Sequence, residues 1–175
     1  MPGVTDSGQP TTFVVVDLDG VLADTRHRLH HLAQRPKDWS AFFAAAVDDP
    51  VLPEGREAVH LAAQAHEVVY LTGRPSTCRA DTLAWLQQHD LPRGRLVMRS
   101  AQDRRPARFM KVDELRRLSR RGEVVMVIDD DEAVVQAVRA EGLPVAHAGW
   151  MPTDTDTERV GQQELFAAQE GEGRT

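Results

Sequence analysis

Short apolar runs that alternate with longer helix-like stretches constrain the fold of this chain more than any other feature of its sequence. The apolar runs lie at 13–16, 67–71, 96–98, 124–128 and 144–147, and the helix-like stretches at 54–65, 76–89, 111–121 and 132–141. Short runs rich in β-branched residues are typical of strands that are buried on both faces. Strands that alternate with helices predict an α/β fold, a doubly wound, three-layer parallel sheet.

Length and composition predict one folded domain between two flexible ends. A chain of 175 residues is long enough for a single domain with a sizeable core. We place the domain at 13–151 and the flexible ends at 1–12 and 152–175, which are mostly polar. Residues 25–50 are too many for a strand-to-helix loop, so we expect a small helical cap insertion there. Its aromatic residues are expected to form its core rather than to stack on bases: Trp39, Phe42 and Phe43.

The bulk composition excludes several classes of protein. No apolar run approaches the ~18 residues that cross a bilayer, and the polar start lacks the features of a secretion signal. We therefore expect a cytoplasmic protein without membrane contact. Cys78 is the only cysteine, which excludes an internal disulfide and a zinc site of several thiolates. The net charge of −6 argues against nonspecific coating of nucleic acid.

One basic segment departs from this acidic average. Between Arg93 and Arg121 there are eleven Lys or Arg residues against three acidic ones. Such a segment either faces a polyanion or is a solvated helix face with its loop, and the sequence favours neither interpretation. Arg104 and Arg105, within the segment, carry the same two interpretations: phosphate contact or a soluble loop.

Carboxylates follow the first and fourth predicted strands at the points where these strands end. Asp17 and Asp19 follow the first strand, and Asp129, Asp130 and Asp131 follow the fourth. Because ligands of doubly wound sheets bind at the carboxyl ends of the strands, we expect these side chains to converge. Converging carboxylates repel one another without a cation, and an all-oxygen donor set suits Mg²⁺ rather than zinc. We therefore predict a Mg²⁺ site with these ligands: Asp17, Asp19, Asp129 and Asp130.

Two further groups of residues near this edge are given other roles. Asp131 is expected to cap the helix at 132–141, where a carboxylate is favourable. The histidines of the insertion lack ligand spacing beside the strands, so we expect surface or lid roles for His27, His30 and His31.

The residue types at this edge suit phosphoryl transfer. Asp17 can act as a carboxylate nucleophile that accepts the phosphoryl group, so that hydrolysis occurs in two steps. Asp19 can protonate the leaving oxygen and later accept a proton from the attacking water, while Gly20 relieves the turn after it. Lys111, expected at the start of a helix, and the Thr72 hydroxyl can hold phosphoryl oxygens. The predicted catalytic residues are Asp17, Asp19, Thr72 and Lys111.

Four motifs in this order resemble those of the haloacid dehalogenase superfamily. They are DLDGVLAD after the first strand, LTGR after the second, a lysine ahead of a helix and IDDD after the fourth strand. The stretches LVMRSAQDRRPARFMKVDEL and VVMVIDDDEAVVQAVRAEGLPVAHAGW also resemble the 3′-phosphatase domain of phage-type polynucleotide kinase-phosphatase, over about residues 13–151. The resemblance implies a Mg²⁺-dependent phosphatase that works through an aspartyl-phosphate on Asp17. The substrate-binding residues that it implies are Gly73, Arg74, Arg99 and Arg104.

The chain departs from that family at two points. The kinase motif G-x-x-x-x-G-K-[ST] is absent, so the sequence predicts no P-loop kinase activity. Asp131 stands where the family has a basic residue after the double aspartate. Its extra negative charge weakens the case for a nucleic-acid 3′-phosphate and leaves phosphomonoester chemistry unaffected.

These observations predict a phosphatase for a nucleic-acid or nucleotide terminal 3′-phosphate. They leave open whether a separate kinase or ligase partner works beside it. A small-metabolite phosphatase is the alternative, which an insertion that closes over the site would favour. A non-enzymatic receiver module also combines acidic residues, a Thr and a Lys on a doubly wound sheet. It fits less well, because its phosphorylated Asp follows a middle strand and its Lys comes near the end.

Overall fold

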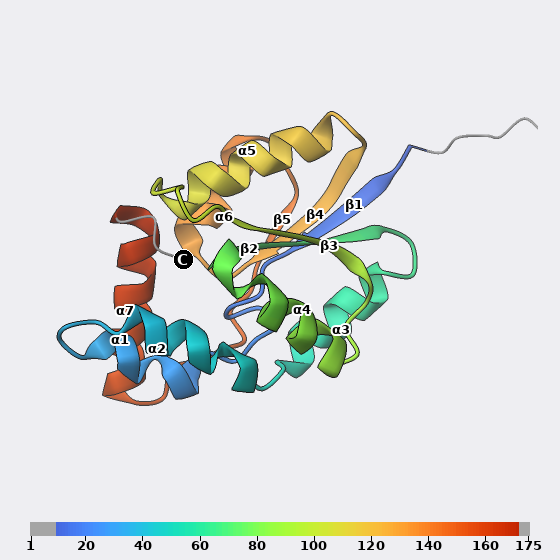
Figure 1. The fold of residues 1–175 in the computed structure, drawn as a ribbon. Helices are drawn as coiled ribbons and strands as arrows, with labels where there is room; N and C mark the ends of the chain where they lie inside the picture. The colour runs from blue at the N-terminus through green and yellow to red at the C-terminus, as the bar shows by residue number, and fades with distance from the viewer. Residues whose placement is uncertain (1–9, 172–175) are drawn as a thin grey trace, which may run out of the picture.

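A five-stranded sheet forms the centre of the computed structural model, which describes residues 10–171 (Figure 1). The strands are β1 (Thr12–Val16), β2 (Glu67–Pro75), β3 (Gly94–Arg99), β4 (Glu123–Asp129) and β5 (Val145–His147). All neighbouring strands are parallel, in the order β3-β2-β1-β4-β5. The predicted α/β class is therefore confirmed, and the carboxyl end of β1 lies between those of β2 and β4.

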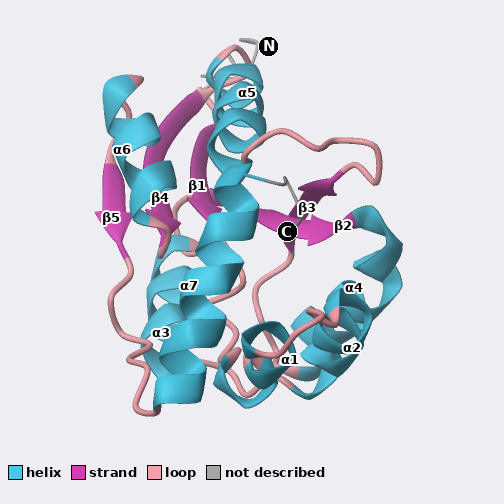
Figure 2. Cartoon of the chain, turned by 90° about the vertical axis from the view of Figure 1, so that its left-hand side faces the viewer, coloured by secondary structure: helices cyan, strands magenta, loops and turns pink. Residues whose placement is uncertain are grey.

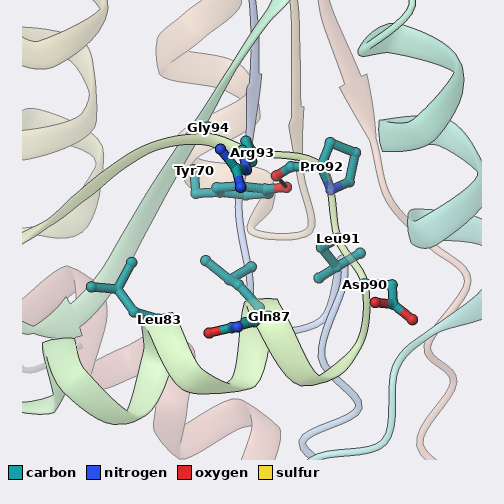
Figure 3. A pocket seen from close by; sticks show the side chains of 9 residues that line it. Tyr70, Leu83, Gln87, Asp90, Leu91, Pro92, Arg93 and Gly94 are labelled. Carbon is teal, nitrogen blue, oxygen red and sulfur yellow. Dashed lines mark hydrogen bonds between the residues drawn. The ribbon is translucent and has the colours of Figure 1, made fainter.

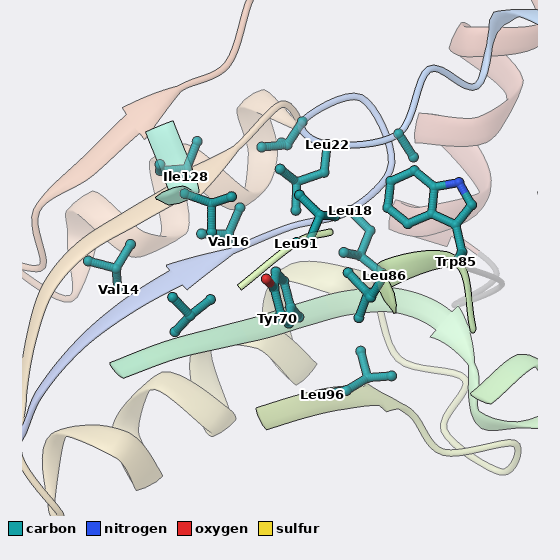
Figure 4. Close-up of a cluster of buried hydrophobic side chains, with 14 of the residues drawn as sticks. Val14, Val16, Leu18, Leu22, Tyr70, Trp85, Leu86, Leu91, Leu96 and Ile128 are labelled. Atoms are coloured by element: carbon teal, nitrogen blue, oxygen red, sulfur yellow. The ribbon is translucent and has the colours of Figure 1, made fainter. Parts of the chain in front are cut away.

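Helices cover both faces of the sheet. They are α3 (Pro53–Ala62), α4 (Arg79–Gln88), α5 (Ala107–Ser119) and α6 (Glu132–Ala140), with a 3-10 turn η3 (Ser76–Cys78) before α4. Val14 and Val16 of β1 belong to the core under α3 and α4, and Figure 4 shows them in the same cluster as Leu86. Phe13 and Val15 point to the other face and pack with α5 and α6. Because both faces of β1 are buried, its sequence is a continuous apolar run.

The residues between Asp24 and Pro50 form the expected helical insertion. Its elements are η1 (Arg26–Arg28), α1 (His30–Ala33), α2 (Trp39–Ala44) and η2 (Ala45–Asp48). The two ends of the insertion meet, since the Asp24 N–H donates to the Pro50 carbonyl at 2.8 Å. Phe42 is fully buried among Leu29 and Leu32, and the other two aromatic residues pack against this cluster. The prediction that the aromatic residues form the core of the insertion is confirmed.

The segment after residue 152 is not a flexible tail throughout, and the prediction for 152–175 is wrong where α7 (Asp156–Gly171) forms. This helix lies along α1 of the insertion (Figures 1 and 2). Leu165 enters the cluster of the insertion, and a Cβ at Gly161 would overlap the carbonyl oxygen of Leu29. The packing face of α7 consists mainly of small residues, so its polar composition hid an amphipathic helix. Residues 1–9 and 172–175 of the predicted ends lie outside the described part.

Two element boundaries differ from the sequence prediction in ways that affect the site. Helix α5 begins at Ala107 rather than at Lys111, so the lysine lies in the second turn of the helix. Strand β2 continues to Pro75, which pairs with Arg99 of β3 after an irregularity in the register. Thr72 and its neighbours therefore belong to the end of the strand, not to a loop after it. No helix within residues 10–171 has the length and apolarity to span a membrane.

Candidate active site

The pairing of β1 with β4 brings Asp17 and Asp129 together. Val16 is the register partner of Ile128, and the Asp17 N–H donates to the Ile128 carbonyl at 3.0 Å. The next side chains along the two strands are the carboxylates. The Lys111 Nζ lies between them, 2.8 Å from Asp17 Oδ2 and 2.6 Å from Asp129 Oδ2. All three groups are buried, so α5 supplies one positive charge to the edge where the strands supply negative ones.

Asp130 completes an acidic cluster at this edge. Asp17, Asp129 and Asp130 each offer a carboxylate oxygen, and these oxygens lie within 4.8 Å of one another. Gly20 has a φ of 76°, and a Cβ at this position would overlap Asp130 Oδ2, so only glycine allows this approach. Asp19, which we also predicted as a metal ligand, is not part of this cluster. Its carboxylate is directed instead toward two arginines.

The electrostatics of the cluster favour a bound cation. Burial raises the pKa of Asp17 to about 7, although the nearby Lys111 ammonium lowers it, and the Asp129 carboxylate raises it further. Burial also raises the pKa of Asp129, and it raises that of Asp130 well above its ordinary value, with a further contribution from Asp17. One lysine therefore does not balance three carboxylates. A divalent cation among these oxygens would, and an all-oxygen donor set fits Mg²⁺.

Asp19 lies in a second, buried network that is balanced in charge. Its Oδ1 accepts from Arg28 Nη2 at 2.8 Å and from Arg74 Nε and Nη2 at 2.9 and 2.5 Å. Asp49 accepts from Arg28 Nε at 2.7 Å and from Nη2 of both arginines at 2.8 Å. Burial alone would raise the pKa of Asp19, but the guanidinium groups of Arg74 and Arg28 lower it to about 2. Two carboxylates and two guanidinium groups thus hold one another in place.

Arg28 and Asp49 were not predicted from the sequence as site residues. Both belong to the two ends of the insertion, and both are almost completely buried. His27 Nε2 lies 2.8 Å from Asp49 Oδ1, and the Trp85 indole donates to the Asp49 carbonyl at 2.8 Å. The one available signal was that Arg28 stands at helical spacing from the apolar Leu32. Charged residues of an insertion are usually solvated, and that expectation hid the signal.

The residues predicted to contact substrate are only partly brought together. Thr72 is buried at the end of β2, and its Oγ1 accepts from the Arg74 N–H at 3.2 Å. The Gly73 carbonyl accepts from Arg99 Nε at 3.3 Å. These contacts place the end of β2 and the end of β3 beside the second network. Arg104, by contrast, is exposed on the loop after β3.

Asp131 has the structural role that the sequence predicted. Its Oδ1 accepts from the Ala133 N–H at 2.9 Å and caps α6. Its own N–H donates to Asp129 Oδ1 at 3.1 Å. The carboxylate that departs from the family pattern is therefore buried in a helix cap, and the same residue orients Asp129.

About half of the basic residues in the segment 93–121 are paired with acidic neighbours. Its ion pairs are Arg95 with Glu114, Arg105 with Asp103 and Asp113, Arg108 with Glu170, Arg116 with Glu141, and Arg117 with Glu114. These contacts favour the interpretation of a solvated face over that of a surface built for a polyanion.

A pocket of about 640 Å³ lies away from the acidic cluster, between α4 and the start of β3 (Figure 3). It is lined by Tyr70, Gln87 and Gly94, among others. Gly94 pairs with Val68 near the start of β2, so the pocket faces the amino-terminal half of these strands. The acidic cluster and the Asp19 network occupy the opposite, carboxyl end of the sheet.

The fold and the clustered groups at this edge define a phosphatase with the haloacid dehalogenase fold. Residues 11–149 match the family model described as the polynucleotide kinase PNKP phosphatase domain. The chain belongs to this family. No curated protein matches it.

Solved structures agree with the family. Two structures of Pnkp1/Rnl/Hen1, one described as an RNA repair complex, are 25% identical, with TM-scores of 0.66 and 0.67. Each match covers 83% of this chain but only 44% and 47% of the others, so the chain spans less than half the length of those proteins. A haloacid dehalogenase-like hydrolase, SP0104 from Streptococcus pneumoniae, is 13% identical, with a TM-score of 0.60, over 91% of both chains. That last likeness concerns the fold alone.

Proposed function

We propose that this protein is a Mg²⁺-dependent phosphomonoester hydrolase that works through an aspartyl-phosphate on Asp17, with a nucleic-acid or nucleotide 3′-phosphate as its substrate. One observation carries the proposal. Asp17, Asp129 and Asp130 converge within 4.8 Å, while Lys111 bridges two of them. A nucleophile, a set of oxygen ligands and a fixed cation are the groups that phosphoryl transfer requires.

Asp17, Asp129 and Asp130 would hold the metal ion. When bound, Mg²⁺ neutralises charge on the phosphoryl oxygens as the transition state forms. Lys111 holds Asp17 from the side through Oδ2, and the Leu18 N–H donates to Asp17 Oδ1 at 2.8 Å. These two contacts orient the carboxylate, so its attack needs little reorganisation.

The reaction then has two balanced steps. In the first, an Asp17 oxygen attacks phosphorus, the bond from phosphorus to the leaving oxygen breaks, and that oxygen takes a proton from Asp19. In the second, a water oxygen attacks the same phosphorus and gives a proton to Asp19. The bond between Asp17 and phosphorus breaks, which releases phosphate and restores the carboxylate.

Arg74 links the second network to the substrate. In the structure it donates to Asp19 and Asp49, while the N–H of the same residue contacts Thr72. A phosphate dianion is a strong partner for a guanidinium group and competes with these carboxylates. When Arg74 turns to the phosphate, Asp19 loses part of the charge that keeps it ionised and becomes able to hold the proton for the first step. Thr72 can then donate its hydroxyl to another phosphoryl oxygen.

The nucleic-acid substrate is supported by the family and by the likeness to proteins of an RNA repair complex. Asp131, the residue that weakened this assignment, is committed to the cap of α6. We also propose that a separate kinase or ligase acts beside this chain, as the composition of those complexes suggests. A small-metabolite phosphatase is the alternative. The cytoplasmic location stays a prediction from the sequence.

A substrate panel tests the proposal. Phosphate release would be measured from one oligonucleotide phosphorylated at its 3′ end, from the same oligonucleotide phosphorylated at its 5′ end, and from several sugar phosphates. We expect the highest kcat/KM for the 3′-phosphate, and loss of activity in EDTA that Mg²⁺ restores. A sugar phosphate as the best substrate would reject the nucleic-acid assignment, and full activity in EDTA would reject the metal.

A further inference from the structure

The end of β5 lies beside the acidic cluster and makes contacts that the proposed mechanism does not use. In the register of the sheet His147 pairs with Asp129, and the Ala148 N–H donates to the Asp129 carbonyl at 2.9 Å. From β5 the chain continues past Trp150 toward α7 (Figure 2). The residues at the end of this edge strand are therefore placed next to the loop that carries Asp130.

The His147 side chain contacts the main chain of Asp130. Its Nε2 lies 2.9 Å from the Asp130 carbonyl oxygen, and Nε2 must carry the hydrogen because a carbonyl oxygen only accepts. Its Nδ1 lies 3.3 Å from Glu132 Oε2, so both ring nitrogens have a partner. The ring is also at the edge of a second pocket, of about 250 Å³, which Gly20 and Asp130 line.

Asp130 depends on such a contact because its carboxylate has no fixed partner. Lys111 contacts the other two carboxylates of the cluster, whereas that of Asp130 forms no ion pair or hydrogen bond within residues 10–171. The other two carboxylates also repel it. Its place against Gly20 is therefore set by its main chain, which His147 holds at the carbonyl.

Trp150 makes a matching contact with the other side of the site. Its indole Nε1 donates to the Val21 carbonyl at 2.9 Å, and its side chain packs against the core cluster that contains Val21. Val21 is fully buried in the DLDGVLAD turn, which carries Asp17 and Asp19. Residues 147–150 thus join the turn of the proposed nucleophile to the loop of a second proposed metal ligand.

We propose that His147 and Trp150 are positioning residues for the metal ion: together they fix Asp130 relative to the turn of Asp17, so that the oxygen ligands are in place before the ion binds. The inference rests on the proposed function, because it requires a metal ion at the acidic cluster. Ligands that are already held in place lose less freedom when the metal binds, so partners outside the ligand set raise its affinity. Both residues act through the main chain of others.

The affinity for Mn²⁺ tests this role without substrate or turnover. Mn²⁺ suits the same oxygen ligands as Mg²⁺, and its electron paramagnetic resonance signal distinguishes free from bound ions. We expect His147→Ala to raise the Kd for Mn²⁺ by roughly 3- to 10-fold, the effect of one hydrogen bond. His147→Gln can donate to the same carbonyl through its amide, and its Kd should stay within about twofold of the wild-type value.

Trp150→Phe provides the second variant, because it keeps an aromatic ring and removes the indole N–H. Its Kd for Mn²⁺ should also rise by roughly 3- to 10-fold. His60→Ala changes an exposed histidine of α3 and should leave the Kd unaltered. Thermal unfolding shows that each variant is folded. An unchanged Kd in His147→Ala or in Trp150→Phe would overturn the proposal, and so would equal losses in His147→Ala and His147→Gln.

Asp130→Asn separates this inference from the proposed function. It removes the ligand itself, so its Kd for Mn²⁺ should rise at least as much as that of His147→Ala. Weaker binding in Asp130→Asn with unchanged binding in the positioning variants would reject the inference alone. Unchanged binding in Asp130→Asn would reject the metal site, and the inference with it. Because no substrate is present, neither result depends on which phosphate ester the protein hydrolyses.

Discussion

The two aspartates of the DLDG turn lie two residues apart, yet their surroundings are opposite. Asp17 faces the sheet edge, where β4 adds two more carboxylates, and its pKa is raised to about 7 by burial. Asp19 faces the insertion, where Arg28 and Arg74 lower its pKa to about 2 against the effect of burial. The first region has one ammonium group, that of Lys111, for three carboxylates, and is suited to a metal ion. The second is already balanced by the chain itself, which suits a group that exchanges protons as its partners move.

The largest expected effect on the contrast between the two aspartates comes from Asp17→Asn, which removes the proposed nucleophile. We expect kcat for release of phosphate from a 3′-phosphorylated oligonucleotide to fall by about 10³-fold or more. Thermal unfolding of the variant shows whether the fold is retained. If Asp17 only held the metal, a large excess of Mg²⁺ would restore activity, and such recovery would contradict the assigned role.

Removing one charge from the second network should mainly affect stability. Asp49→Asn leaves two buried guanidinium groups with a single carboxylate, and we expect the free energy of unfolding to fall by about 3 kcal/mol. Urea unfolding measures this change. Asp48→Asn alters the exposed neighbouring residue, and its effect should be within about 0.5 kcal/mol. Equal effects of the two substitutions would show that the network does not hold the insertion in place.

Asp130→Asn tests the assignment of the first region as a metal site, because it removes one proposed ligand. The Mg²⁺ concentration for half-maximal activity should rise by about tenfold, since a neutral amide replaces a charged oxygen ligand. Asp131→Asn is the matched control, because asparagine also caps helices well. A Mg²⁺ dependence that is the same for both variants would place the metal elsewhere.

The last prediction concerns the pH dependence of stability. In metal-free protein the folded-state pKa of Asp17 is about 7, above its ordinary value of 3.8, so between these values the folded state holds a proton that the unfolded state releases. Stability therefore falls as pH rises from about 4 to 7, with a slope of at most about 1.4 kcal/mol per pH unit. Urea unfolding in EDTA measures this slope. It should weaken in Asp17→Asn and in Mg²⁺, and a slope of opposite sign would contradict the raised pKa.

The sequence predicted the first region well because local patterns determine it. A buried parallel strand must end at the same edge as its neighbours, so carboxylates that follow two such strands converge. The convergence of Asp17, Asp129 and Asp130 could therefore be predicted without the structure. Lys111 was predicted at the edge although its helix begins earlier than expected.

The second region and α7 were not predictable in the same way. Arg28 lies beside Arg74 because of the way the insertion folds, and no periodic pattern in the sequence predicts this. Both arginines donate to Asp49, which lies between them in the sequence. The buried face of α7 relies on residues such as Gly161 and Ala168, whose burial comes from close approach and not from hydrophobic size. Contacts of this kind depend on tertiary structure, and a hydrophobicity pattern does not contain them.

The central claim is that Asp17 receives the phosphoryl group. Borohydride added during turnover of a 3′-phosphorylated oligonucleotide reduces an aspartyl-phosphate to homoserine, which peptide mass spectrometry locates. We predict homoserine at position 17, dependent on both substrate and Mg²⁺. Release of phosphate at the full rate with Asp17 unmodified, or homoserine at another aspartate, would contradict the account.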